Sequence, residues 1–133
     1  MEAYTLVAAG VGVGAGFLSA QLAPCRPTSS DASTPPSWIF SVVWAALYAA
    51  QGVALVRSKS LLLFSVVILE LMWPFVFCTS RHLSTWMLTP IIALCLLLLR
   101  TDDTFLASSA AATAAWLIFA QGLGARSLTD RTD

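Results

Sequence analysis

The chain has too little charge for a soluble domain. Only 11% of its 133 residues are charged, whereas 58% are hydrophobic and the mean hydropathy is +0.81. A soluble domain carries roughly a quarter charged residues. The seven basic and seven acidic residues balance to a net charge of zero, and the basic residues stand singly rather than in a patch for nucleic acid. The composition therefore predicts an integral membrane protein without a nucleic-acid partner.

Residues that build metal sites, disulfide frameworks and catalytic sites are also scarce. The only histidine, His82, has no partner motif, and the three cysteines, Cys25, Cys78 and Cys95, form no CxxC pair. We therefore expect no metal site or disulfide framework and interpret the cysteines as small apolar filler. The sequence contains no nucleophile–base pair or phosphate loop, so we predict a protein that is not an enzyme and that requires no cofactor.

Long apolar runs are abundant instead. Each run is close to the ~20 residues that a helix needs to cross a membrane. None shows the alternation of a membrane β-barrel strand. The runs predict an all-α fold, an integral membrane bundle of five transmembrane helices in a single domain, at about residues 3–23, 38–56, 61–78, 84–99 and 104–124. The run at 84–99 carries few features and is interpreted as a wall facing lipid.

The connections between the runs predict how the helices are arranged. Three connections are short, which favours antiparallel neighbours in an up-down bundle. The segment 24–37 is longer, polar and rich in proline, and is either a plain spacer or a lid over a pocket. An odd number of spans predicts termini on opposite sides of the membrane. The basic residues divide three against four between the two sides, which favours a cytoplasmic C-terminus only weakly.

The first run contains the glycine-rich stretch GVGVGAG at 10–16. Ala15 stands where a dinucleotide-binding motif would need its last glycine, and no strand precedes the stretch. Ala8, Gly12 and Gly16 would share one helix face, and small residues four apart let helix backbones approach closely. The stretch therefore predicts close helix packing, within the chain or between two copies of it.

Two runs place aromatic residues at helical spacing. Trp44, Tyr48 and Gln51 fall on one side of the helix expected at 38–56. Trp116 occupies a similar stripe in the run at 104–124, between Thr113 and Ala120. Their polar groups lie deep in the membrane and need partners. Two interpretations stay open: contacts between helices that satisfy these groups, or the wall of a cavity for a flat aromatic ligand.

Glu70 is the least expected residue, because it falls near the middle of the run at 61–78. An ionised carboxylate at the centre of a membrane costs about 2.5–3.5 kcal/mol on insertion scales. The side chain must therefore face the interior of the bundle, be protonated, or both. Pro74 has no N–H to donate to the carbonyl of residue 70, so a free carbonyl accompanies the carboxyl. Either a structural hydrogen bond or a functional polar site fits this pattern.

The segment PPSWIFSVVWAALYAAQGVA, Pro35 to Ala54, resembles the second-helix signature of the TspO/MBR family. That family includes the tryptophan-rich sensory proteins and the translocator protein, also called the peripheral benzodiazepine receptor. The segments WPFVF at 73–77 and WLIFA at 116–120 resemble, more weakly, its third and fifth helices. The resemblance covers the chain from about Pro35 to Leu123.

The resemblance implies five helices around a pocket that opens towards one face and is capped by the loop between the first two helices. It implies homodimers and ligands such as porphyrin, haem, cholesterol and drug-like aromatic molecules. We therefore expect a protein that binds a tetrapyrrole or a similar flat ligand among membrane lipids, in a sensory, transport or porphyrin-handling role. The candidate ligand-binding residues are Trp44, Tyr48, Glu70, Trp73, Phe77, Trp116, Phe119, Ala120 and Leu123.

Several positions depart from the family pattern. The family has Asn at the position of Glu70, which predicts a more acidic pocket, and a Pro-Tyr pair at the position of Ala112-Thr113. The C-terminal segment lacks the tyrosine of the cholesterol-recognition segment, so we do not expect cholesterol binding. Glu70 also supports an alternative function, a small proton-coupled transporter in which this carboxyl exchanges the proton.

Overall fold

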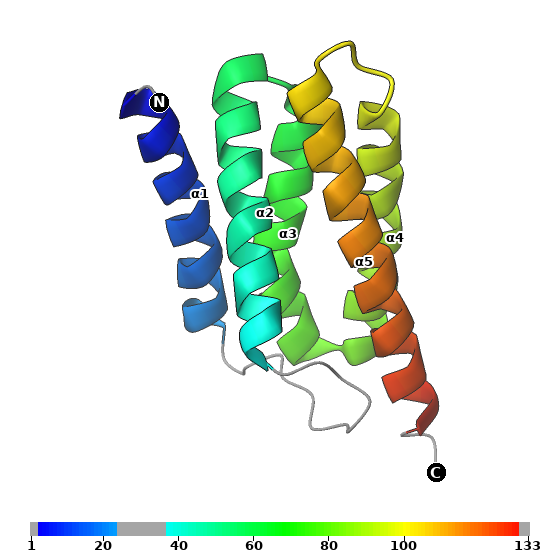
Figure 1. Cartoon of the computed structure of the whole chain (residues 1–133). Coiled ribbons are helices and arrows are strands. Elements are labelled where there is room, and N and C mark those ends of the chain that lie inside the picture. The colour runs from blue at the N-terminus through cyan, green and yellow to red at the C-terminus, as the bar shows by residue number, and fades with distance from the viewer. Residues whose placement is uncertain (1–2, 24–36, 131–133) are drawn as a thin grey trace.

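The computed structural model describes residues 3–23 and 37–130, and Figure 1 shows a bundle of helices in this part of the chain. All five helices are long and apolar enough to cross a membrane. The prediction of an all-α, five-helix bundle is therefore confirmed, as expected for a multi-pass membrane protein. The helices are α1 (Ala3–Leu22), α2 (Ser37–Ser58), α3 (Leu61–Thr79), α4 (Arg81–Leu98) and α5 (Thr104–Asp130).

Two helix boundaries differ by three or more residues from the predicted ones. Ser80 caps α4, because its side chain accepts a hydrogen bond from the Leu83 N–H at 3.2 Å, so α4 begins at Arg81 rather than near 84. α5 continues to Asp130 rather than ending near 124. The prediction followed the end of the apolar run, whereas the helix extends beyond it in polar residues. Residues 24–36 of the predicted lid lie outside the described residues.

The helices form a closed ring. Each packs against two ring neighbours in the order α1, α2, α5, α4, α3 and back to α1, and α2 also touches α3 across the ring. Figure 1 shows consecutive helices running antiparallel. As a result, α2 and α5 lie side by side although a whole helical hairpin separates them in the sequence.

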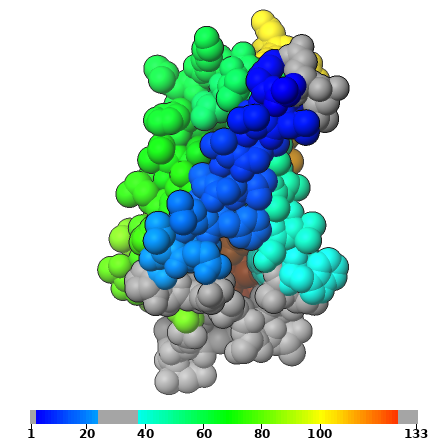
Figure 2. Space-filling model, turned by 90° about the vertical axis from the view of Figure 1, so that its left-hand side faces the viewer, coloured from blue at the N-terminus to red at the C-terminus, as the bar shows by residue number. Residues whose placement is uncertain are grey.

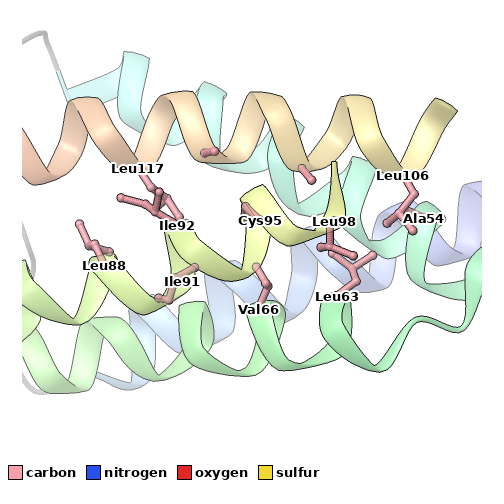
Figure 3. Packing of buried hydrophobic residues seen from close by; sticks show 12 residues of the cluster. Ala54, Leu63, Val66, Leu88, Ile91, Ile92, Cys95, Leu98, Leu106 and Leu117 are labelled. Atoms are coloured by element: carbon pink, nitrogen blue, oxygen red, sulfur yellow. The ribbon is translucent and has the colours of Figure 1, made fainter. Parts of the chain in front are cut away.

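α4 contributes the largest share of the core and is not a simple lipid-facing wall. Leu88, Ile91 and Cys95 are at most 3% exposed, and Figure 3 shows them between residues of α3 and α5 such as Val66 and Leu117. The opposite side of α4 exposes other leucines. The expectation from sequence was wrong because a leucine that faces lipid and one that faces another helix are equally apolar.

α1 and α2 approach closely through their small residues. A Cβ added at Gly12 would overlap the main-chain carbonyl of Tyr48, and one added at Gly52 would overlap the carbonyl of Ala8. At Gly16 it would overlap the Tyr48 ring. Glycine at these positions therefore permits the contact, and the predicted face of Ala8, Gly12 and Gly16 packs within the chain.

Cys95 and Cys78 differ in their oxidation state. Cys95 is free and 1% exposed in the core, as expected of apolar filler. Cys78 is disulfide-bonded, so that interpretation was wrong for Cys78. Cys25 lies outside the described residues.

Candidate functional site

Five aromatic rings of α2 and α5 form one continuous cluster, here called the aromatic cluster. Ring centroids of Trp44 and Tyr48 are 5.5 Å apart in a stacked arrangement. The Trp116 ring on α5 meets Trp44 edge-on at 6.4 Å, and it contacts Phe40 at 5.3 Å and Phe119 at 5.4 Å. The spacing of three or four residues along each helix brings these rings to the α2–α5 contact.

Burial differs across the aromatic cluster. Tyr48 is buried, Trp44 and Trp116 are half-buried, and Phe119 is exposed. The indole Nε1 of Trp116 is itself buried and has no hydrogen-bond partner among the described residues. A buried indole N–H usually donates to an acceptor. This N–H is therefore an unsatisfied donor at the α2–α5 contact.

A second group, here called the polar cluster, joins α2, α3 and α5 through Gln51, Glu70 and Thr113. The Gln51 Nε2 donates to Glu70 Oε1 at 3.3 Å and to Thr113 Oγ1 at 3.0 Å. The Thr113 hydroxyl donates in turn to the Ser109 carbonyl at 2.8 Å. The three side chains of the cluster are 1–2% exposed, so they lie inside the ring of helices.

The polar cluster is not fully satisfied. Gln51 Oε1 and Glu70 Oε2 are buried and have no hydrogen-bond partner in the part of the chain that the structure describes. The described basic residues all lie at helix ends or in connections, so none of them neutralises Glu70. Pro74, also buried, removes the helical donor for the Glu70 carbonyl. A buried carboxyl in such a place requires a proton or a cation.

The two clusters lie at successive levels of the bundle. Tyr48 precedes Gln51 by three residues on α2, and Trp116 follows Thr113 by three residues on α5. Because α2 and α5 are antiparallel (Figure 1), Tyr48 and Trp116 both lie nearer than Gln51 and Thr113 to the end of the bundle where α2 begins. The aromatic cluster therefore lies about one turn beyond the polar cluster, nearer that end.

Trp73 and Phe77 form a separate pair on α3. Their ring centroids are 5.3 Å apart, and the Trp73 Nε1 donates to the Ser84 carbonyl of α4 at 2.9 Å. The Arg81 guanidinium lies 5.1 Å from the centre of the Phe77 ring. These contacts tie α3 to the start of α4.

The structure thus brings together only some of the predicted ligand-binding residues. Trp44, Tyr48, Trp116 and Phe119 meet in the aromatic cluster, whereas Glu70 belongs to the polar cluster about one turn away. Ala120 and Leu123 are half-buried on α5 beyond Trp116, and Ala120 packs against the core.

Gln51 and Thr113 were not among the predicted binding residues, although they stand on the same helical stripes as Trp44 and Trp116. Their depth in apolar runs was the available signal. Their hydrogen bond could not be foreseen, because the spacing of residues along each helix does not show which side chains of two helices meet.

The described part of the chain has a pocket and a recess on its surface. An open pocket lies at the far end of the bundle, lined by polar residues such as Ser58, Arg100 and Asp103, and no predicted site residue lines it. Figure 2 shows a recess between α1 and the first half of α2, within which atoms of α5 are visible. This recess lies towards the end of the bundle that carries the aromatic cluster.

The comparisons with known proteins add no assignment. Comparison with family models, with curated proteins and with solved structures found no match.

Proposed function

We propose that the chain is a membrane protein that binds flat aromatic ligands at the aromatic cluster, with tetrapyrroles such as porphyrin or haem as the first candidates. The observation that carries this proposal is the set of ring contacts around Trp116, which meets Phe40, Trp44 and Phe119. Aromatic faces offer a flat ligand stacking as well as apolar burial. The unpartnered Trp116 N–H adds a directional donor.

The resemblance to the TspO/MBR family supports the same ligand class. Trp44 and Tyr48 belong to the segment that resembles the second-helix signature, and Trp116 to the one that resembles the fifth helix. In this proposal the protein senses, transports or otherwise handles its ligand, acts as a homodimer, and performs no chemistry of its own. Trp73 and Phe77 support the site from α3 rather than stacking on the ligand, because Trp73 is held by the Ser84 carbonyl.

The test is a titration of protoporphyrin into the purified protein, followed by the quenching of tryptophan fluorescence. Saturable quenching by about one ligand per chain supports the proposal. Tryptophan quenching that rises linearly without saturation, as it does for an unrelated membrane protein in the same detergent, would exclude a specific site.

A second candidate function is proton-coupled transport through Glu70. It is favoured by the near-complete burial of this carboxyl and by its unpartnered Oε2, since ionisable groups inside a membrane often serve as proton relays. Uptake of a substrate into vesicles that depends on an imposed proton gradient, without saturable porphyrin binding, would favour this candidate over the first.

A further inference from the structure

The polar cluster has a property that stacking of a flat apolar ligand leaves unexplained. Glu70 is 2% exposed, and its Oε2 and the Gln51 Oε1 both lack a hydrogen-bond donor. These two oxygens come from helices α2 and α3, and the hydrogen bond between Gln51 and Glu70 holds the two side chains together at 3.3 Å. Two acceptors and one potential negative charge thus lie together inside the bundle.

We propose that the polar cluster binds the head group of an organic monocation with two or more N–H donors, an amidinium or a primary ammonium, whose aromatic body lies on the aromatic cluster. The inference rests on the proposed function, because the aromatic cluster would supply the surface for the rest of the ligand. It specifies the charge of the head group that reaches Glu70: a carboxylate, such as a propionate of a tetrapyrrole, would be repelled from this level and would have to point away from it.

The chemistry of the two clusters is complementary to such a ligand. Two N–H groups of the head group would satisfy Glu70 Oε2 and Gln51 Oε1, and the carboxylate would neutralise the positive charge. Tyr48, about one turn from Gln51, and the indoles next to it offer aromatic faces, which attract cations most strongly where water is excluded. The polar cluster is closed to solvent, so entry from the side of the recess in Figure 2 requires these rings to shift.

Without the ligand, the carboxyl of Glu70 holds a proton, since a lone ionised carboxylate inside the bundle is costly. Binding of the monocation therefore transfers that proton to the solvent: a neutral carboxyl and a cation become an ion pair and one released proton. The other titratable side chains that sense the charge of Glu70 are Tyr48 on α2 and Cys95 on α4. The described parts of α1 and α5 bring no ionisable side chain to this level.

The experiment compares benzamidine, benzamide and benzoate, which share one ring and differ in the charge of the head group. Binding to the protein in detergent is measured by calorimetry at about pH 8 and about pH 5, because a proton and the amidinium compete for the same carboxyl. We expect benzamidine to bind at least about tenfold more tightly than benzamide at the higher pH, and to lose most of this advantage at the lower pH. Benzoate should bind most weakly.

Two variants test whether Glu70 causes the preference for benzamidine over benzamide. Glu70→Gln keeps the shape of the side chain and removes the charge, so it should abolish the preference for benzamidine. Asp102→Asn, at an exposed position in the α4–α5 connection, is the matched control and should leave the preference intact. If Glu70→Gln does not fold, calorimetry of the wild type in buffers of different ionisation enthalpy still tests the inference, because it predicts the release of about one proton for each benzamidine bound.

Equal affinities for benzamidine and benzamide in the wild type, no binding of benzamidine at all, or binding without proton release would each overturn the inference. Saturable porphyrin binding together with any of these results would leave the proposed function standing. Absence of porphyrin binding together with charge-selective binding of benzamidine would instead remove the tetrapyrrole and keep the cation site.

Discussion

At the scale of single residues, Gly16 and Tyr48 form a contact that positions the aromatic cluster. The ring of Tyr48 stacks on Trp44 on one side and lies against Gly16 of α1 on the other. A methyl group at Gly16 would approach the Tyr48 Cγ to 2.9 Å, which is closer than packed atoms tolerate. The absence of a side chain on α1 therefore fixes where a ring on α2 can lie.

We expect Gly16→Ala to destabilise the protein by about 1–3 kcal/mol, the usual cost of overpacking a closely packed site. Gly14→Ala is the matched control on the same helix, because no atom lies within 4 Å of its added Cβ. The control should change stability by less than about 1 kcal/mol, and in the favourable direction, since alanine is the better helix former. Denaturation in detergent measures both variants. Equal effects of the two substitutions would show that α1 and α2 do not pack through this face.

At the scale of helices, the sequence predicted the elements better than their partners. The apolar runs located all five helices, because crossing a membrane requires about twenty apolar residues whichever helices are neighbours. The runs did not show that α4 packs into the core. Inside a membrane, hydrophobicity does not distinguish a face that touches lipid from one that touches protein, so helix partners follow from packing that a single sequence does not display.

The candidate site was predictable to a similar extent. Trp44, Tyr48 and Trp116 could be selected from helical spacing and from the resemblance to a family signature. Trp73 could be selected in the same way, yet its indole N–H is used by the Ser84 carbonyl of α4. That hydrogen bond crosses from α3 to α4, and nothing in the spacing of the residues indicates it.

The hydrogen bond of Trp73 predicts a structural role at the α3–α4 junction. Trp73→Phe keeps an aromatic ring and removes the donor, so it should lower stability by about 1 kcal/mol while porphyrin affinity stays within twofold of the wild type, or about 0.4 kcal/mol. Trp86→Phe is the control for tryptophan loss, because Trp86 is exposed on α4. Stability is measured by denaturation and affinity by the absorbance of bound porphyrin. A large loss of affinity with unchanged stability would place Trp73 in the binding site instead.

At the scale of the whole molecule, five spans place the ends of the described chain on opposite sides of the membrane. Cys78 lies near the end of α3, at the same end of the bundle as the last turn of α5 (Figure 1). Its disulfide indicates an oxidising compartment on that side. The count of basic residues favoured the opposite orientation by a single residue.

We therefore predict that a reporter fused to the N-terminus lies in the cytoplasm and one fused to the C-terminus lies outside it. Reporters that are active in only one type of compartment measure this directly. Both reporters on the same side would contradict the number of spans, whereas exchanged sides would contradict only the orientation drawn from Cys78.

Ligand binding at the contact between α2 and α5 is tested by the protoporphyrin affinity of tryptophan variants from different helices. Trp44→Ala and Trp116→Ala should each weaken binding by more than ~1 kcal/mol, the scale of a lost aromatic contact. Trp86→Ala, which removes an exposed indole from α4, should leave affinity unchanged. Unchanged affinity in both the Trp44 and the Trp116 variants, with the helical fold intact, would contradict the account.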